Sequence, residues 1–239
     1  MPGRALLACH ELRYQYPRGG RGIFDLTLTI GRGEVYGLLG ANGAGKTTLI
    51  HLLLGLLNPT SGEVLFDDKL LSEDGMAARS RTAYIPEISQ LYPALSAFQV
   101  LSFFDGLMGR STRPAEYEAT LSKLGFPGDA TRQPIARYSK GMRQKVVIAL
   151  GILKGADLFV LDEPTAGLDP TSARDLYRIV ADLAAQGKAV LFSSHDVLAF
   201  SQAASQVGVL HQGRLILEES AASFRRRDIH LLLREVAGD

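Results

Sequence analysis

A glycine-rich segment, GANGAGKTT at residues 40–48, combines residue types that can bind a phosphate chain. Four residues separate Gly40 from Gly45, which is followed by Lys46 and Thr47, and apolar runs lie on both sides. Glycines let successive N–H groups converge on a phosphate, the lysine can reach the β- and γ-phosphates, and the threonine hydroxyl can bind Mg²⁺. We therefore expect a P-loop, with a simple glycine-rich turn as the alternative.

Two acidic residues follow a second apolar run, LFVL at 158–161. Asp162 stands where a strand would end, and a carboxylate there can hold Mg²⁺ through water. Glu163 comes next and can polarise a water that attacks the γ-phosphate, which is the task of a general base. The pair could also be turn residues, but a P-loop in the same chain favours nucleotide hydrolysis.

A histidine ends a third apolar run, AVLFSSH at 189–195. In a parallel sheet His195 would emerge at the same edge as Glu163 and the P-loop, where α/β sheets bind ligands. A neutral imidazole there can hydrogen-bond a γ-phosphate oxygen. An isolated histidine is more often structural, but this placement favours a role in the site.

A second possible phosphate site is the segment RYSKGMRQK at 137–145, where a helical pattern begins. A small hydroxyl, a glycine and the unpaired N–H groups of a helix start attract phosphate. Because the P-loop already binds one phosphate chain, the residues alone leave open whose phosphate this segment would hold.

The elements that must position these residues change in type along the chain. The alternating runs IFDLTLTI and EVLFDDKLL, with GRGE and PTSGE as turns, predict antiparallel strands around the P-loop. A helical block begins at Ser96, which forms a capping box with Gln99. Strands at 158–161 and 189–195, with a helix from about Thr171 to Gln186 between them, imply parallel pairing. The predicted fold class is α/β.

Composition and charge exclude several classes of protein. The 239 residues are 46% hydrophobic and 21% charged, and the net charge of +1 gives no general attraction to nucleic acid. No apolar run approaches the roughly 18 residues of a membrane span, and the N-terminus lacks the apolar core of a signal peptide, so we expect a cytoplasmic protein. The single cysteine, Cys9, is expected to be an inert thiol, and the charge run at 225–227 a solvated face.

In sequence order the motifs resemble those of the nucleotide-binding subunits of ATP-binding cassette (ABC) transporters, over nearly the whole chain. GANGAGKTT resembles Walker A, LFVLDEP Walker B, AGLD at 166–169 the D-loop, and YSKGM the signature motif LSGGQ. The resemblance implies an ATP hydrolase with ATP and Mg²⁺ as its ligands. It implies catalytic roles for Glu163 and the switch histidine His195, metal binding by Thr47 and Asp162, and ATP binding by Gly40, Asn42, Gly43, Gly45, Lys46, Thr47 and Thr48.

The resemblance also implies an occupant for the second phosphate site. Two subunits pack head to tail, so that Ser139 and Gly141 of one hold the γ-phosphate of ATP bound to the other. It further implies an integral membrane permease as partner, no nucleic acid, and a peripheral position on the cytoplasmic face of the inner membrane.

The implied fold is a P-loop NTPase (RecA-like) core with an N-terminal antiparallel β subdomain and an inserted α-helical subdomain. The chain is expected to be one ABC ATPase domain. Residues 1–85 and 152–220 would form the β subdomain and core, residues 86–151 the helical subdomain with the signature, and residues 221–239 a C-terminal tail.

The chain departs from the family pattern at several positions. Lys140 replaces the first signature glycine and either adds charge near the partner's phosphates or faces solvent. Tyr138 and Met142 replace the first leucine and the glutamine of the signature. Glu87 replaces a glutamine that touches Mg²⁺, and its carboxylate could still bind the ion. For stacking on adenine, the spacing favours Tyr16 over Tyr14.

The segments YIPE, LYP and YSKGMRQK are similar to an exporter branch whose ATPase is a separate polypeptide paired with a six-helix membrane subunit. The ATPase of a copper-linked maturation system for nitrous-oxide reductase is one candidate within it, and drug or lipid exporters are others. The alternative is a soluble, non-transport ABC ATPase that acts as a mechanical switch. A small GTPase is disfavoured because the chain has no Asn-Lys-x-Asp motif.

Overall fold

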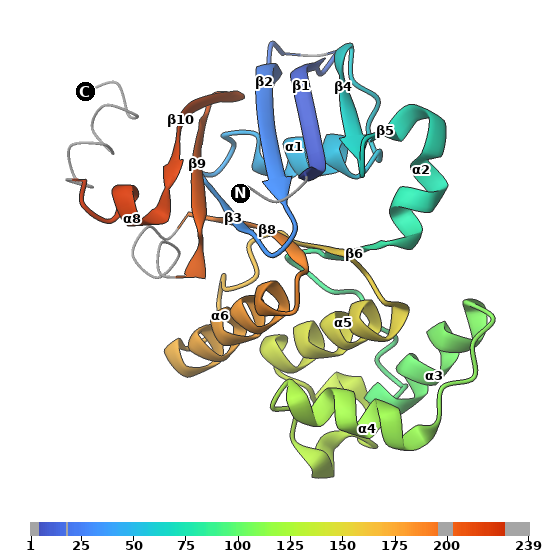
Figure 1. The fold of residues 1–239 in the computed structure, drawn as a ribbon. Coiled ribbons are helices and arrows are strands. Elements are labelled where there is room, and N and C mark those ends of the chain that lie inside the picture. The colour runs from blue at the N-terminus through green and yellow to red at the C-terminus, as the bar shows by residue number, and fades with distance from the viewer. Residues whose placement is uncertain (1–4, 18, 196–202, 228–239) are drawn as a thin grey trace.

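The computed structural model describes residues 5–17, 19–195 and 203–227. Within this part of the chain the strands form two sheets (Figure 1). The antiparallel sheet has the order β2-β1-β4-β5, with β1 Ala5–Gln15, β2 Gly22–Gly31, β4 Ser61–Phe66 and β5 Lys69–Leu70. The larger sheet has the order β10-β9-β3-β8-β7-β6, with β3 Val35–Leu39, β6 Thr82–Ile85, β7 Leu158–Leu161, β8 Ala189–Ser194, β9 Gln206–His211 and β10 Arg214–Ser220.

The centre of the larger sheet is parallel, as the apolar runs predict. Strand β3 pairs in parallel with β8 and β9, and β7 pairs in parallel with β8 and β6, whereas β10 is antiparallel to β9. All residues of β3, β7 and β8 are buried, which is why their sequences are mostly apolar rather than alternating, with Ser193 and Ser194 at the end of β8 as exceptions. The parallel pairing brings the carboxyl ends of these three strands to one edge of the sheet.

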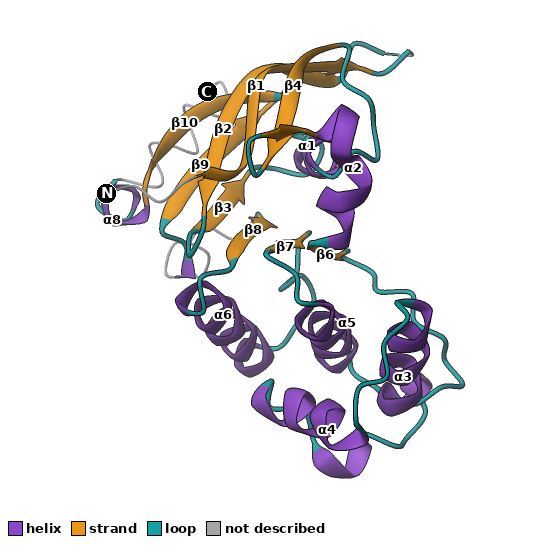
Figure 2. Cartoon of the chain, turned by 45° about the vertical axis from the view of Figure 1, so that its right-hand side comes forward, coloured by secondary structure: helices purple, strands orange, loops and turns teal. Residues whose placement is uncertain are grey.

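Helices cover both faces of the larger sheet (Figure 2). Val35 and Leu39 of β3 pack into a core shared with the helices α3 to α6, whereas Tyr36 and Leu38 pack into a core shared with α1 and the antiparallel sheet. The predicted fold class is confirmed. The helices are α1 Lys46–Leu53, α2 Leu71–Ser80, α3 Ala97–Leu107, α4 Pro114–Lys123, α5 Lys140–Lys154, α6 Pro170–Ala185 and α8 Ala221–Phe224, with 3-10 turns at Gly128–Ala130 and Ile135–Arg137.

Helix α5 connects the sheet to α3 and α4, which lie on its far side (Figure 2). At Gly151 a Cβ atom would come within 2.5 Å of the Ala83 Cβ and 2.7 Å of the Phe159 ring, so only glycine lets α5 approach β6 and β7 this closely. Helix α3 begins at the predicted capping box, in which Ser96 accepts the Gln99 N–H and the Gln99 side chain accepts the Ser96 N–H.

Three further expectations concern Cys9, membrane-spanning helices and the C-terminal tail. Burial raises the pKa of the Cys9 thiol to about 12, in keeping with the predicted inert role. None of the described helices has the length and hydropathy needed to cross a membrane. Residues 228–239 of the predicted C-terminal tail lie outside the described residues.

Candidate functional site

The P-loop connects β3 to α1 at the carboxyl edge of the parallel strands. Gly43 and Gly45 have φ values of 83° and 111°, where a side chain would be strained, and a Cβ on Gly40 would meet the Leu210 carbonyl oxygen at 2.6 Å. Helix α1 begins directly after Gly45 without a side-chain cap. The loop therefore presents helix-start N–H groups that a phosphate can satisfy.

Lys46 is buried at the base of this loop. Its Nζ donates to the Gly40 and Ala41 carbonyl oxygens, at 2.5 and 3.2 Å, and lies 3.0 Å from Oε1 of Glu163. A cation that has lost its water needs such partners. In this structure Lys46 thus forms an ion pair with Glu163, the second residue after β7.

The structure brings together two of the three residues predicted to hold the metal ion, Thr47 and Asp162. The Thr47 hydroxyl donates to Asp162 Oδ2 at 2.8 Å, although the two residues are far apart in sequence. Tyr84 of β6 lies nearby, and burial, with the negative charge of Asp162 adding to it, raises the pKa of its hydroxyl to about 12. Tyr84 therefore remains a neutral neighbour of the carboxylate at neutral pH.

Ser193 is a residue of the site that the sequence reasoning missed. Its hydroxyl donates to Asp162 Oδ1 at 2.6 Å and accepts the Glu163 N–H at 2.8 Å, so one side chain on β8 orients both acids on β7. The available signal was a pair of serines, Ser193 and Ser194, at the end of an otherwise apolar strand just before His195.

Glu163 has a backbone conformation that is unusual for a residue with a long side chain. Its φ of 45° is in the left-handed region, which costs on the order of 1 kcal/mol or more and persists only where neighbours hold it. The carboxylate is buried, and its Oε2 lies 2.9 Å from Nδ1 of His195, whose ring is half exposed. The predicted base and histidine are therefore in contact.

An open cleft of about 1050 Å³ runs along the P-loop and is large enough for a nucleotide. Tyr16 lines it, and the hydroxyl oxygen of Tyr16 lies 3.2 Å from Thr48 Oγ1. Tyr14 contacts Tyr16 edge to face but packs on the core. The turn at 211–214 also lines the cleft and supports the P-loop, a feature that the sequence reasoning missed.

The signature segment lies outside this cleft. Ser139 caps α5 by accepting the Met142 N–H at 3.2 Å, and Ser139 and Gly141 line a separate small hollow beside Leu168 and Ser172. Neither Ser139 nor Gly141 is among the described residues that line the nucleotide cleft. The two predicted phosphate sites of one chain are therefore distinct.

The departures in the signature have structural explanations. The Nζ of Lys140 donates to the Ala166 carbonyl oxygen at 2.6 Å, in the predicted D-loop of the same chain, a contact that the sequence reasoning did not predict. Tyr138 is buried, its hydroxyl lying 2.7 Å from the Ala130 carbonyl and accepting the Ala97 N–H at 3.1 Å. The tyrosine thereby ties the start of α3 to the loop before α5.

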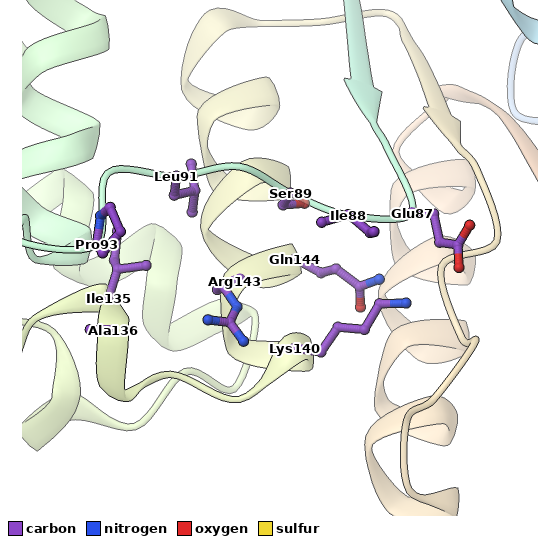
Figure 3. A pocket seen from close by; sticks show the side chains of 10 residues that line it. All are labelled: Glu87, Ile88, Ser89, Leu91, Pro93, Ile135, Ala136, Lys140, Arg143 and Gln144. Atoms are coloured by element: carbon purple, nitrogen blue, oxygen red, sulfur yellow. The ribbon is translucent and has the colours of Figure 1, made fainter.

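Glu87 lines both the nucleotide cleft and a second pocket beside α5 (Figure 3).

Comparison with known proteins identifies the family. The model of the ABC transporter family matches residues 23–166, more than half of the chain, including the P-loop, the signature and both acids. The chain belongs to the ABC transporter family. Within it, the chain is an ATP-binding subunit that hydrolyses ATP.

The relatives match this ABC subunit over most of its length. A fluoroquinolones export ATP-binding protein of Mycobacterium tuberculosis is 32% identical over 93% of the chain and 73% of its own length. The lantibiotic transport ATP-binding protein SrtF of Streptococcus pyogenes is 32% identical over 90% of both. Among solved structures, cbiO1 of Clostridium perfringens has a TM-score of 0.83 at 27% identity, over 97% of this chain and 95% of its own. A dimeric cassette with ADP and Pi bound shares the fold, with a TM-score of 0.79 at 20% identity, over 90% of this chain and 98% of its own.

Proposed function

We propose that two copies of this ABC subunit close head to tail over two ATP molecules and thereby drive a separate export permease. The observation that carries the proposal is the separation of the two phosphate sites within one chain. A γ-phosphate held by both a P-loop and a signature must then lie between two chains. The relatives support it, because one solved cassette is dimeric and several relatives are named for export.

In this proposal the P-loop and Lys46 bind the phosphates, and Tyr16 stacks on the adenine. Glu163 accepts the proton of the attacking water, and His195 contacts the γ-phosphate. Two features support the roles of Glu163 and His195: their 2.9 Å contact and their place at the carboxyl ends of β7 and β8. The division into core, helical subdomain 86–151 and tail is part of the same proposal.

The residues present also fit a magnesium ion, which we assign to Thr47 and Asp162 with Glu87 nearby. A hydroxyl and a carboxylate are the hard oxygen donors that Mg²⁺ prefers, and the ion takes its other ligands from phosphates and water. No cluster of three acidic, histidine or cysteine ligands occurs in the described part of the chain, as suits an ion that phosphates help to hold. When bound, the ion would neutralise charge on the β- and γ-phosphates.

Glu87→Gln tests the acidic residue that lines the cleft. We expect ATP binding to persist and the Mg²⁺ concentration for half-maximal hydrolysis to rise, because the variant loses a carboxylate near the ion. Mg²⁺ titrations of hydrolysis and of fluorescent ATP binding would measure both effects. An unchanged Mg²⁺ dependence would remove Glu87 from the metal site.

A cluster of exposed apolar side chains supports contact with a permease. Tyr92 and Phe103 are in edge-to-face contact, and Leu107 lies one helical turn after Phe103 on α3. Tyr92, Phe103 and Leu107 are 58%, 47% and 68% exposed, and a group of exposed apolar side chains is typical of a contact surface. In this proposal the permease covers this surface, and the subunit lies peripherally on the cytoplasmic face of the inner membrane. The surface favours a transporter over a soluble mechanical switch.

The decisive test uses the Glu163→Gln variant, in which ATP persists. On a sizing column MgATP should convert its monomer to a dimer, whereas MgADP should not. Adding Gly141→Asp should raise the dimer dissociation constant on the order of a hundredfold or more, because a carboxylate would face the partner's γ-phosphate. Within the monomer, a Cβ at Gly141 has no neighbour closer than 3.7 Å, so the substitution should not disturb the fold.

Gly141→Asn in the same background is the matched control, since it has the same size without the charge, and it should retain much more of the dimer. Loss of ATP binding by the Gly141→Asp monomer would mean that the signature serves its own chain. Undiminished dimerisation would mean that Gly141 faces no phosphate.

A further inference from the structure

Two side chains of α5 hold the segment that follows Glu163. Lys140 and Gln144 lie one turn apart on the helix, and they donate to the carbonyl oxygens of Ala166 and Pro164, both at 2.6 Å. Figure 3 shows both side chains extending from the same side of α5. The first turns of the signature helix are therefore bonded to the loop that carries the proposed base.

This loop is short and internally bonded. The Ala166 N–H donates to the Glu163 carbonyl oxygen at 3.2 Å, while the Ala166 carbonyl oxygen accepts from Lys140. Ala166 thus links the Lys140 side chain to the backbone of Glu163 through two hydrogen bonds. Because Glu163 is held at a φ of 45°, its position depends on such external bonds.

The lysine occupies a place where a cation is otherwise unfavourable. Lys140 is the first residue of α5, and the positive end of a helix dipole repels a cation there. Its bond to Ala166 offsets this repulsion, since hydrogen bonds from charged donors are about twice as strong as neutral ones. Ser139 and Gly141, the predicted phosphate ligands, are its immediate neighbours.

The surroundings leave room for a second arrangement of this contact. A pocket of about 380 Å³, lined by Lys140, Gln144 and Ser89 among others, separates the start of α5 from the segment at 87–93. Gln144 Oε1 and Ser89 Oγ are buried there without a hydrogen-bond partner among the described residues. Buried polar atoms are usually bonded, and the pocket is large enough to hold water molecules that bond these two.

We infer that Lys140 is a positioning residue that links the phosphate held at Ser139 and Gly141 to Glu163 of the same chain. The inference rests on the proposed dimer, in which that phosphate belongs to the partner's ATP. A phosphate at the start of α5 fixes its first turn, and Lys140 then fixes Ala166 and the backbone of Glu163. Each chain thereby sets its own base only when its partner is loaded, which makes hydrolysis cooperative.

Lys140→Met tests this link, because methionine keeps an unbranched side chain of similar length but cannot donate. We expect kcat to fall roughly tenfold, the loss of one charged hydrogen bond, with KM little changed. The Hill coefficient for ATP should fall from about 2 toward about 1, since the two sites lose their coupling. Lys140→Arg should restore much of both, because arginine also donates with a positive charge.

Lys145→Met is the matched control, because Lys145 lies on the same helix but bonds to Gly125 and Asp175, outside the loop. It should keep the wild-type Hill coefficient. In the Glu163→Gln background, Lys140→Met should still dimerise with MgATP, and its thermal unfolding midpoint should match that background.

Three results would overturn the inference while leaving the proposed dimer intact. The first is a wild-type Hill coefficient in Lys140→Met. The second is a fall of kcat and of the Hill coefficient in Lys145→Met equal to that in Lys140→Met. The third is failure of Lys140→Arg to restore cooperativity. If the Glu163→Gln protein stayed monomeric with MgATP, the proposed dimer and this inference would both fail.

Discussion

Glu163→Gln is expected to slow ATP hydrolysis on the order of a hundredfold or more while ATP still binds. The amide has the shape of the carboxylate but cannot accept the proton of the attacking water. The backbone of residue 163 should stay in place, because the bond from its N–H to Ser193 does not involve the side chain. Single-turnover hydrolysis with excess protein, beside equilibrium titration with a fluorescent ATP analogue, would separate the chemical step from binding.

A matched control is Glu118→Gln, the same chemical change on exposed α4, where the carboxylate lies 3.7 Å from Arg132. It should hydrolyse ATP at the wild-type rate. If Glu163→Gln also retained near-wild-type single-turnover hydrolysis, another group would be the base.

Lys46→Ala should remove nearly all hydrolysis and lower ATP affinity on the order of a hundredfold or more. In the proposed complex the lysine would make charge-assisted contacts with the phosphates worth roughly 1.5–3 kcal/mol each, and no other described cation lies in the P-loop to replace them. Equilibrium titration and steady-state turnover would measure the two losses.

The control for this substitution is Lys69→Ala, because the Lys69 side chain is 71% exposed and its ion-pair partner is Asp74 on the nearby α2. ATP affinity and steady-state turnover should both be unchanged in that variant. Wild-type turnover in Lys46→Ala would end the P-loop interpretation of residues 40–48.

The sequence predicted those helices and strands whose formation depends mainly on their own residues. The apolar runs LFVL of β7 and AVLF of β8 indicated buried parallel strands, and the capping box at Ser96 indicated the start of α3. The P-loop was equally plain, because its glycines meet local backbone requirements. These signals lie within short windows of sequence.

The missed parts of the site depend on contacts between distant segments. The role of Ser193 requires β7 and β8 to be in register, and the bond from Lys140 to Ala166 requires α5 to be seated against the loop after β7. The Lys140 contact leaves no pattern in the residue types, and the Ser193 contact leaves only the hydroxyl residues at the end of β8. The functions assigned to individual site residues, Tyr16 and Glu87 included, stay predictions until they are tested, and so does the cargo, with the nitrous-oxide reductase system as one option.

The ion pair between Lys46 and Glu163 makes nucleotide binding an exchange of partners. In the proposed mechanism an incoming γ-phosphate would take the lysine from the carboxylate, and the freed carboxylate would then face the water that it must activate. After hydrolysis, departure of inorganic phosphate would leave Lys46 with one anion fewer, and Glu163 would compete with the remaining diphosphate for Lys46. The side chain that starts the reaction would therefore also hasten the release of spent nucleotide and reset the cleft for the next turnover.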